Sequence, residues 1–193
     1  MSSASTDGPA SDPAATDLER ALGVRAAGGD DGAFRLLVGR HAAGLGDLAY
    51  RVIGRRDEVD DAVQEALLRA WKSRAAYDGG HAYSTWLYRV ALNVCRDRLR
   101  RLRVRGAAPP PEPTAGDGPG PLEAAERRDE AARVRAAVAR LTADERELVA
   151  LRVHRGLSFQ EAAEVLGAPP STLKSRMQQA LAKLRRMLAE VPC

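Results

Sequence analysis

Apolar residues recur three or four positions apart over most of this chain, which is the spacing of one face of an α-helix. The pattern extends from about residue 31 to residue 103 and again from about residue 122 to residue 188. Between the two stretches, residues 105–121 read RGAAPPPEPTAGDGPGP, and this density of proline and glycine favours neither helix nor strand. We therefore predict an all-α protein of two small helical domains, an N-terminal helical bundle and a C-terminal helix-turn-helix domain, joined by a flexible linker.

Domain boundaries follow from the same pattern. The first residues are rich in Ser, Ala, Pro, Gly and Asp, a composition typical of disordered segments. Gly44 and Gly46 are poor residues for a helix interior and are candidates for a break within the first domain. The expected units are a disordered tail over residues 1–29, a first domain over 30–104, a linker over 105–121 and a second domain over 122–189.

Residues 157–186, LSFQEAAEVLGAPPSTLKSRMQQALAKLRR, predict two helices joined by a tight turn. Gly167 stands where a left-handed C-cap residue would stand, and Pro169 and Pro170 prevent the first helix from continuing. Either of the hydroxyl residues that follow, Ser171 or Thr172, can cap the second helix.

The second of these helices has two unlike faces. Apolar residues fall on one side, at Leu173, Met177, Ala180, Leu184 and Leu188. Hydroxyl, amide and cationic residues fall on the other, at Thr172, Ser175, Gln178, Gln179 and Arg186, with Lys174 at the edge. A helix that reads a DNA major groove needs this division. The alternative is a surface helical hairpin of an ordinary α-protein.

The last helix expected in the first domain is basic on one side. It begins near Ser84 or Thr85, either of which can cap it. At 100° per residue a narrow stripe contains Arg89, Arg96, Arg100 and Arg103, with Asn93 on its edge. Apolar residues occupy the opposite side, at Leu87, Val90, Ala91 and Val94. Such a stripe suits phosphate groups, and the alternative is a solvated charged face.

A short loop precedes this helix. Residues 77–83 read YDGGHAY, and Trp86 follows. Glycines allow the backbone to fold into a small pocket, and aromatic faces can stack on an unpaired base. Taken alone, Tyr77, Tyr83 and Trp86 are more typical of core packing than of base stacking.

An acidic face is expected on the preceding helix, which starts near Asp57. Its buried side consists of Val59, Val63, Ala66, Leu67, Ala70 and Trp71. Its opposite side carries Asp60, Asp61, Gln64 and Glu65. Short acidic and amide groups on a rigid helix can pair with arginines of a partner protein, and the alternative is a solvated acidic patch.

Composition narrows the class of protein. The 193 residues carry a net charge of only +4, but the cations concentrate at 89–105 and 174–186, as expected for nucleic-acid contacts. Two cysteines are too few for a zinc module or a disulfide framework, so we expect Cys95 to pack as a small apolar residue. His41, His81 and His154 lack metal-ligand spacing, and the sequence contains no catalytic or phosphate-binding motif. We expect no enzyme activity, no metal and no cofactor.

The first 20 residues lack the apolar core and the early positive charge of a signal peptide. No apolar run approaches the roughly 20 residues of a membrane span. We therefore expect a cytoplasmic protein.

Three stretches together resemble the bacterial RNA polymerase sigma factors, specifically the extracytoplasmic-function (ECF) group. They are residues 57–71, DEVDDAVQEALLRAW; residues 84–100, STWLYRVALNVCRDRLR; and residues 141–176, LTADERELVALRVHRGLSFQEAAEVLGAPPSTLKSR. Their order, with a proline-rich tether between the domains, is specific to this family. The resemblance implies a sigma factor that binds core RNA polymerase and directs promoter recognition, DNA melting and transcription initiation.

The resemblance also implies roles for single residues. Contacts with core polymerase are implied for Asp61, Gln64 and Glu65. Contacts with the melted −10 element are implied for Asp78, His81, Tyr83, Trp86, Arg89, Asn93, Arg96 and Arg100, with a flipped base in the loop. Contacts with the duplex −35 element are implied for Thr172, Lys174, Ser175, Arg176, Gln178 and Gln179. Binding of extruded bases would offset the cost of unstacking, so that melting needs no ATP.

Departures from the family pattern affect specificity. Gln178 and Gln179 stand where relatives often carry Arg or aromatic residues, and amides favour adenine edges over guanine. The implied partners are core RNA polymerase, promoter DNA and a cognate anti-sigma factor. The alternative function is a helix-turn-helix regulator that binds duplex DNA without being a polymerase subunit.

Overall fold

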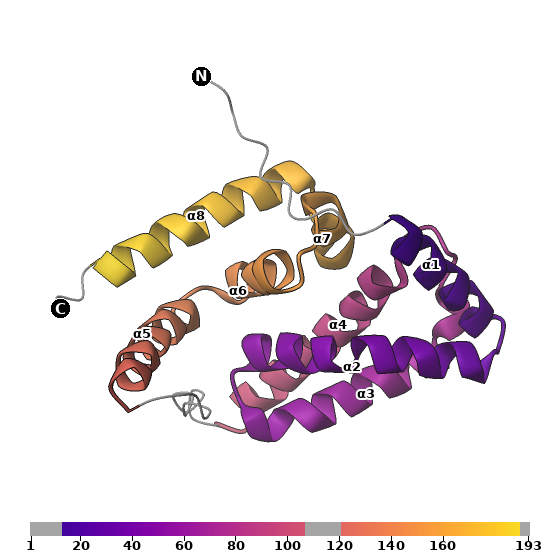
Figure 1. Ribbon diagram of the computed structural model, residues 1–193, viewed down its shortest axis with the longest axis horizontal. Helices are drawn as coiled ribbons and strands as arrows, with labels where there is room; N and C mark the ends of the chain where they lie inside the picture. The colour runs from indigo at the N-terminus through magenta and orange to yellow at the C-terminus, as the bar shows by residue number, and fades with distance from the viewer. Residues whose placement is uncertain (1–12, 107–120, 190–193) are drawn as a thin grey trace.

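The computed structural model describes residues 13–106 and 121–189, and all regular elements in those two parts of the chain are helical (Figure 1). The N-terminal elements are α1 (Pro13–Ala27), α2 (Asp31–Ile53), η1 (Arg56–Glu58), α3 (Val59–Lys72), η2 (Arg74–Ala76) and α4 (Tyr83–Val104). The C-terminal elements are α5 (Pro121–Ala139), α6 (Ala143–Val149), the π-helical turn η3 (Ala150–His154), α7 (Phe159–Leu166) and α8 (Pro170–Ala189). The predicted all-α class with two helical domains is confirmed.

The chain between the two domains is only partly described. Residues 107–120, most of the predicted linker, and residues 1–12 lie outside the described residues. In the described parts, no helix combines the length and apolar character needed to cross a membrane.

Helices α2, α3 and α4 pack together as the N-terminal bundle (Figure 1). Asp30 caps α2, because its Oδ1 accepts a hydrogen bond from the Ala33 N–H at 2.9 Å. That bond and the neighbouring Arg25 lower the pKa of Asp30. The helix ends at Gly54, whose φ of 77° is the left-handed conformation of a C-cap glycine. The local sequence thus defines both ends of the longest helix.

The expected break at Gly44 and Gly46 is wrong, because α2 runs through both glycines without interruption. Gly44 serves a close approach instead. A Cβ atom there would overlap the guanidinium of Arg155 and lie 3.2 Å from the Tyr88 hydroxyl. Glycine in a helix costs about 0.5–1 kcal/mol relative to alanine. At this position glycine leaves room for Arg155 of the C-terminal domain to lie directly against the helix.

The expected disorder of residues 1–29 is wrong for residues 13–27, which form α1. Leu22 and Ala26, one helical turn apart, are buried in the core of the N-terminal bundle. At Gly23 an added Cβ would overlap the rings of Tyr77 and Tyr83, so α1 lies close against the loop before α4. Composition indicated disorder because the apolar residues of this helix are mostly alanines, and the bundle supplies the surface that buries Leu22 and Ala26.

The helix-turn-helix has the local signals that the sequence predicts. Ser158 and Glu161 form a reciprocal capping box at the start of α7, and Gly167 ends α7 with a φ of 67°. Helix α8 begins at Pro170, one residue before the expected caps, since proline is favoured at the first helical position. On α8, Leu173, Met177 and Ala180 are buried, as predicted.

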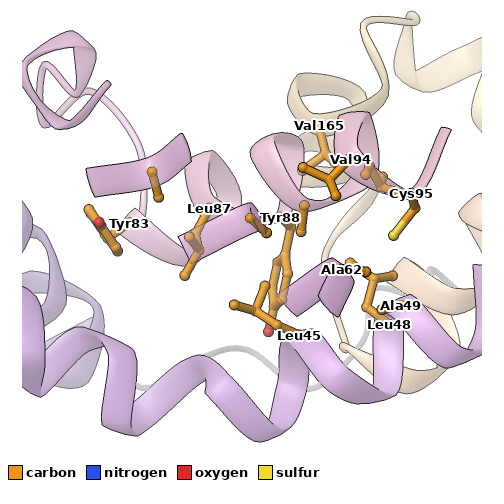
Figure 2. Close-up of a cluster of buried hydrophobic side chains, with 14 of the residues drawn as sticks. Leu45, Leu48, Ala49, Ala62, Tyr83, Leu87, Tyr88, Val94, Cys95 and Val165 are labelled. Atoms are coloured by element: carbon orange, nitrogen blue, oxygen red, sulfur yellow. The ribbon is translucent and has the colours of Figure 1, made fainter. Parts of the chain in front are cut away.

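The two domains share a hydrophobic core in this structure. Four residues of the C-terminal domain belong to the same buried cluster as the N-terminal bundle: Ala150, Leu151, Leu157 and Val165. Figure 2 shows Val165 of α7 beside Val94 of α4, with Tyr88 directed from α4 toward Leu45 of α2. A second cluster, which includes Leu148 and Leu173, lies within the C-terminal domain. Helix α7 therefore packs on both cores.

Candidate nucleic-acid and protein interfaces

Helix α4 has the two faces that the sequence predicts. Leu87, Ala91 and Val94 are buried. On the other side lies what we call the α4 stripe, defined as Arg89, Asn93, Arg96 and Arg100. Arg89 and Asn93 are exposed, Arg96 is half-buried and the side chain of Arg100 is 76% exposed. The predicted cationic surface therefore exists, but its members differ in accessibility.

Arg96 is bound to the C-terminal domain. Its Nε and Nη2 donate to the two carboxylate oxygens of Glu147 in α6, at 3.0 Å and 2.6 Å. The Glu147 side chain is 2% exposed, whereas that of Arg96 remains 39% exposed, so the pair is buried on its glutamate side. The hydrogen bonds raise the pKa of Arg96, because they favour the charged guanidinium. This planar, two-bond arrangement is also how arginine holds a phosphate.

Helix α7 occupies the start of the stripe. The Arg89 Nη2 donates to the backbone carbonyl oxygen of Glu164 at 2.6 Å. The Nδ1 of His81 lies 3.0 Å from the Oε2 of the same Glu164. Burial raises the pKa of Glu164, while His81 opposes this by favouring the carboxylate. One residue of α7 therefore contacts both the loop and the first arginine of the stripe.

The loop before α4 is held by its own side chains. Asp78 accepts a hydrogen bond from the Gly80 N–H at 2.8 Å, and the Tyr77 hydroxyl donates to the carbonyl oxygen of His81. Gly79 has a φ of 77°, which glycine adopts without strain. Asp78 and His81 are exposed at the surface. The loop is thus held by internal hydrogen bonds and presents Asp78 and His81 to solvent.

The aromatic residues of this region pack on one another. The ring centroids lie 5.1 Å apart for Tyr77 and Tyr83, and 5.2 Å apart for Tyr83 and Trp86. Tyr77 and Tyr83 are buried and Trp86 is partly buried. Burial raises the pKa of Tyr77 to about 12 and that of Tyr83 further. In this conformation, then, the buried Tyr83 ring packs between the rings of Tyr77 and Trp86, and Trp86 is the most accessible of the three.

Glu19 of α1 is a residue that the sequence interpretation missed. Its Oε1 accepts a hydrogen bond from the Ser84 N–H, so it caps α4 from 65 positions away. The expected local caps are wrong: α4 starts at Tyr83, and its N-cap residue, Ala82, has no capping side chain. His41 lies 3.5 Å from the same carboxylate. Nothing in the sequence near Ser84 points to a partner so distant along the chain.

Helix α3 carries the acidic face. The side chain of Asp61 is 71% exposed and Gln64 is also exposed, whereas Glu65 pairs with Arg69 and with Arg98 of α4. Leu68 shares the face of Asp61 and Gln64 by its spacing and is 53% exposed. The outer face of α3 therefore combines polar groups with an exposed leucine, and Glu65 belongs partly to the interior ion pairs.

Helix α8 presents its polar face to solvent. The exposed residues include Thr172, Lys174, Ser175, Gln178 and Gln179. Arg176 is partly buried, and its Nη1 lies 3.3 Å from the Asp144 carboxylate. The aliphatic part of Lys174 extends beside α7, with its Nζ 5.8 Å from the centroid of the Phe159 ring. Five of the six predicted −35 residues thus lie on one open surface.

The structure offers little for metal or thiol chemistry. Within residues 13–106 and 121–189, no group of three His, Cys, Asp or Glu residues could hold a metal ion. Burial raises the pKa of Cys95 to about 12, so its thiol stays protonated and packs as a small apolar group, as predicted. Cys193 lies outside the described residues.

Comparisons with known proteins match both domains. The family described as Sigma-70 region 2 matches residues 37–105, and Sigma-70, region 4, matches residues 131–184. The RNA polymerase sigma factor CnrH of Cupriavidus metallidurans is 34% identical over 181 residues, which cover 89% of this chain and 95% of CnrH. The ECF RNA polymerase sigma factor SigM of Mycobacterium tuberculosis is 35% identical over 162 residues, covering 83% of this chain and 79% of SigM.

A solved structure agrees with these matches. CnrH in complex with the cytosolic domain of CnrY has a TM-score of 0.71 and 31% identity to this chain. The superposition covers 91% of this chain and 100% of the CnrH chain. Helix α1 lies outside both matched family segments, and it is α1 that contributes the cap of α4.

Proposed function

This chain belongs to the ECF group of bacterial RNA polymerase sigma factors, and from that premise we propose that it binds core RNA polymerase and directs it to one class of promoters. The observation that carries the proposal is the pairing of two unlike surfaces on separate domains. The α4 stripe suits a phosphate backbone, and the polar face of α8 suits a major groove. The chain acts by binding and contributes no catalytic group of its own.

The outer face of α3 is the proposed contact with core polymerase. Asp61 and Gln64 offer exposed polar groups, and Leu68, one helical turn after Gln64, adds apolar area beside them. Glu65 also holds Arg98 of α4, so it connects the contact face to the helix that carries the stripe. Glu58 and Asp61 also lie within ion-pair distance of Arg98, so several carboxylates connect this region to α4.

The N-terminal bundle is proposed to melt and hold the −10 element. Arg89, Arg96 and Arg100 would bind the backbone of the non-template strand, and Asn93 would contact the strand between them. The loop with Asp78 and His81 would receive an extruded base, with Trp86 as the accessible ring and Tyr83 as its support. Base binding offsets unstacking, which costs on the order of a few kcal/mol per step.

The polar face of α8 is proposed to read the −35 element as duplex. Gln178 and Gln179 present amides, which pair well with the N6 and N7 of adenine. Lys174, Ser175 and Thr172 lie around them, and Arg176 lies at the edge beside Asp144. We infer a −35 element with adenine at the positions facing the two glutamines.

A protein that restrains the sigma factor is the remaining proposed partner. CnrH, which resembles this chain over nearly all of its length, has been solved in complex with the cytosolic domain of a second protein, CnrY. We propose that an anti-sigma factor binds this chain in its two-domain form. The other candidate function, a duplex-binding regulator outside the polymerase, leaves the region 2 match unexplained and is not favoured.

Run-off transcription from a fragmented genome with purified core polymerase tests the function directly. Defined start sites that require the added chain are the expected result. An Asp61→Arg/Gln64→Ala variant should lose core binding in a pull-down, while the exposed control Glu130→Arg should retain it. No defined start site with wild-type protein, or equal core binding by both variants, would refute the proposal.

A further inference from the structure

Helix α1 lies directly against the loop that is proposed to receive an extruded base. A Cβ atom added at Gly79 would lie 2.9 Å from Cγ2 of Val24 and 4.0 Å from Cγ of Arg20. Gly23, between these two residues in the sequence, lies against the ring of Tyr77. A nucleotide held in the loop is therefore within reach of the side chains that α1 displays at this edge.

Arg20 is a cation on this edge of α1. Its side chain is 42% exposed, and its Nη1 donates to the Asp17 carboxylate at 3.3 Å. The Asp17 side chain is 74% exposed, and a surface ion pair of this kind contributes little to stability. The buried Nε of Arg20 donates to no group in the described parts of the chain. The guanidinium can therefore turn from Asp17 to another anion without breaking a second hydrogen bond.

The charge of Arg20 already acts on the loop. Burial raises the pKa of Tyr77 to about 12, and the Arg20 cation opposes this by favouring the phenolate. The Tyr77 hydroxyl donates to the carbonyl oxygen of His81, so this hydroxyl lies within the loop. The guanidinium thus lies close enough to the loop to influence a group inside it.

Two carboxylates also lie near this hydroxyl, those of Glu19 and Asp78. Asp78 accepts a hydrogen bond from the Gly80 N–H, and Glu19 accepts one from the Ser84 N–H. Both carboxylates therefore bind the backbone of the loop and of α4, whereas Arg20 pairs with Asp17 at the surface.

Other cations adjoin the end of the loop. The His81 side chain is 51% exposed and Arg89 is exposed, and both contact Glu164, so they lie together. Extruding a base swings its nucleotide about the backbone, so the phosphates on its two sides both approach the protein. Cations at two places along the loop match that arrangement.

We propose that Arg20 of α1 binds a strand phosphate next to the extruded −10 base, so that the phosphates around this base are held from two helices, α1 and α4. The contact is to the backbone, so it adds affinity and fixes the position of the base without adding sequence preference. Helix α1 lies outside the matched region 2 segment, which begins at residue 37. The inference rests on the proposed −10 function of the loop and the α4 stripe.

Arg20→Met tests the contact, because methionine keeps an unbranched apolar stem beside Gly79 and removes the charge. The probe is a fluorescein-labelled promoter, mapped by run-off transcription, whose −10 region is left unpaired by mismatches. It is titrated with holoenzyme made from core polymerase and the full-length chain. We expect an affinity loss of about tenfold, the effect of one charge-assisted hydrogen bond. Arg20→Lys should keep most of the affinity, and Arg35→Ala, an exposed arginine of α2, should keep all of it.

Neutral phosphates locate the contact on the strand. A methylphosphonate is placed in turn at each phosphate of the unpaired non-template strand. Wild-type holoenzyme should lose affinity at the phosphate beside the extruded base. Arg20→Met should lose nothing more at that phosphate, but should still lose affinity at phosphates held by Arg100. Such a result pairs one side chain with one phosphate, which a general weakening of α1 packing would not produce.

Two results would overturn the inference. One is binding by Arg20→Met equal to that of Arg35→Ala, and the other is a loss at every methylphosphonate as large as that of wild type. Arg100→Met separates these results from a failure of the −10 function. If Arg100→Met loses affinity and Arg20→Met does not, only the α1 contact is wrong. If neither loses affinity, the stripe does not bind the strand. Circular dichroism at 222 nm verifies folding, and Arg20→Ala replaces Arg20→Met if the methionine variant does not fold.

Discussion

The two surfaces proposed to bind DNA differ in how available they are. On α8 the polar side chains face solvent, whereas on α4 two of the three arginines are engaged by α6 and α7. Both helices show the same division into an apolar and a polar face. The difference teaches that an amphipathic pattern identifies a binding surface but not its state of occupation. The polar face of α8 has no partner domain on it in the described residues, whereas Arg89 and Arg96 of the α4 stripe are bonded to α7 and α6.

The largest effect is expected from substitutions in the α4 stripe. Arg96→Ala/Arg100→Ala should reduce open-complex formation by the holoenzyme about 100-fold, since two charge-assisted hydrogen bonds at about 1.5 kcal/mol each are lost. Binding to the closed promoter should change far less, because α8 still holds the −35 element. Permanganate footprinting of melted thymines measures the first quantity and a mobility shift the second. Unchanged footprints would remove the −10 role of the stripe, and Arg40→Ala is the control.

Substitutions on the polar face of α8 should affect binding to duplex DNA more than melting of the −10 element. Gln178→Ala/Gln179→Ala removes two amides, and one bidentate base contact is worth about 1–3 kcal/mol, so duplex affinity should fall about tenfold or more. Transcription from a promoter whose −10 region is already unpaired should lose less. Fluorescence anisotropy with a mapped −35 duplex provides the number, and Gln160→Ala on α7 is the matched amide control. Equal losses for the two variants would contradict the assignment of the α8 face.

Substitution of Glu19 should have a smaller, indirect effect, limited to the N-terminal bundle and to melting of the −10 element. Glu19→Ala removes the cap of α4, and lost caps cost about 0.5–2 kcal/mol, which lowers the Tm of a small domain by about 4–8 °C per kcal/mol. Melting of the −10 element should fall several-fold, because the loop is no longer fixed against α1. Glu19→Gln keeps an acceptor oxygen and should restore most of both properties. If Gln behaves as Ala does, the cap is not the reason for the effect.

The smallest effect is a dependence of stability on pH. Burial lowers the pKa of His41 below its ordinary 6.5 and outweighs the nearby Glu19 carboxylate, which favours the charged form. A depressed histidine pKa means that the stabilising contribution is present above pH 6.5 and is lost as the pH falls through the folded-state pKa. Calorimetry at pH 7.5 and pH 5.5 should show a lower Tm at pH 5.5. The drop should shrink in His41→Gln and persist in the control Arg35→Ala, an exposed arginine of the same helix.

Sequence reasoning succeeded where the deciding forces are local. The faces of α4 and α8 follow from a period of 3.6 residues, and the turn at Gly167 follows from the left-handed conformation that glycine tolerates. It failed at α1, because a helix whose apolar residues are mostly alanines has no strong pattern of its own. It also failed at the start of α4, where the cap is Glu19 and not Ser84 or Thr85.

By itself, the sequence determined the helical class, the two domains, the family and the residues that make up each polar face, because helix periodicity and turn chemistry act over a few neighbouring positions. Only the tertiary structure decided that α1 joins the bundle, that Glu19 caps α4, and that Glu147 and Glu164 lie on the stripe. The contacts of Glu19, Glu147 and Glu164 join residues more than 50 positions apart, and the energy of all these contacts exists only when packing brings the partners together. Local patterns record which groups a helix displays, and the folded chain decides what those groups bind.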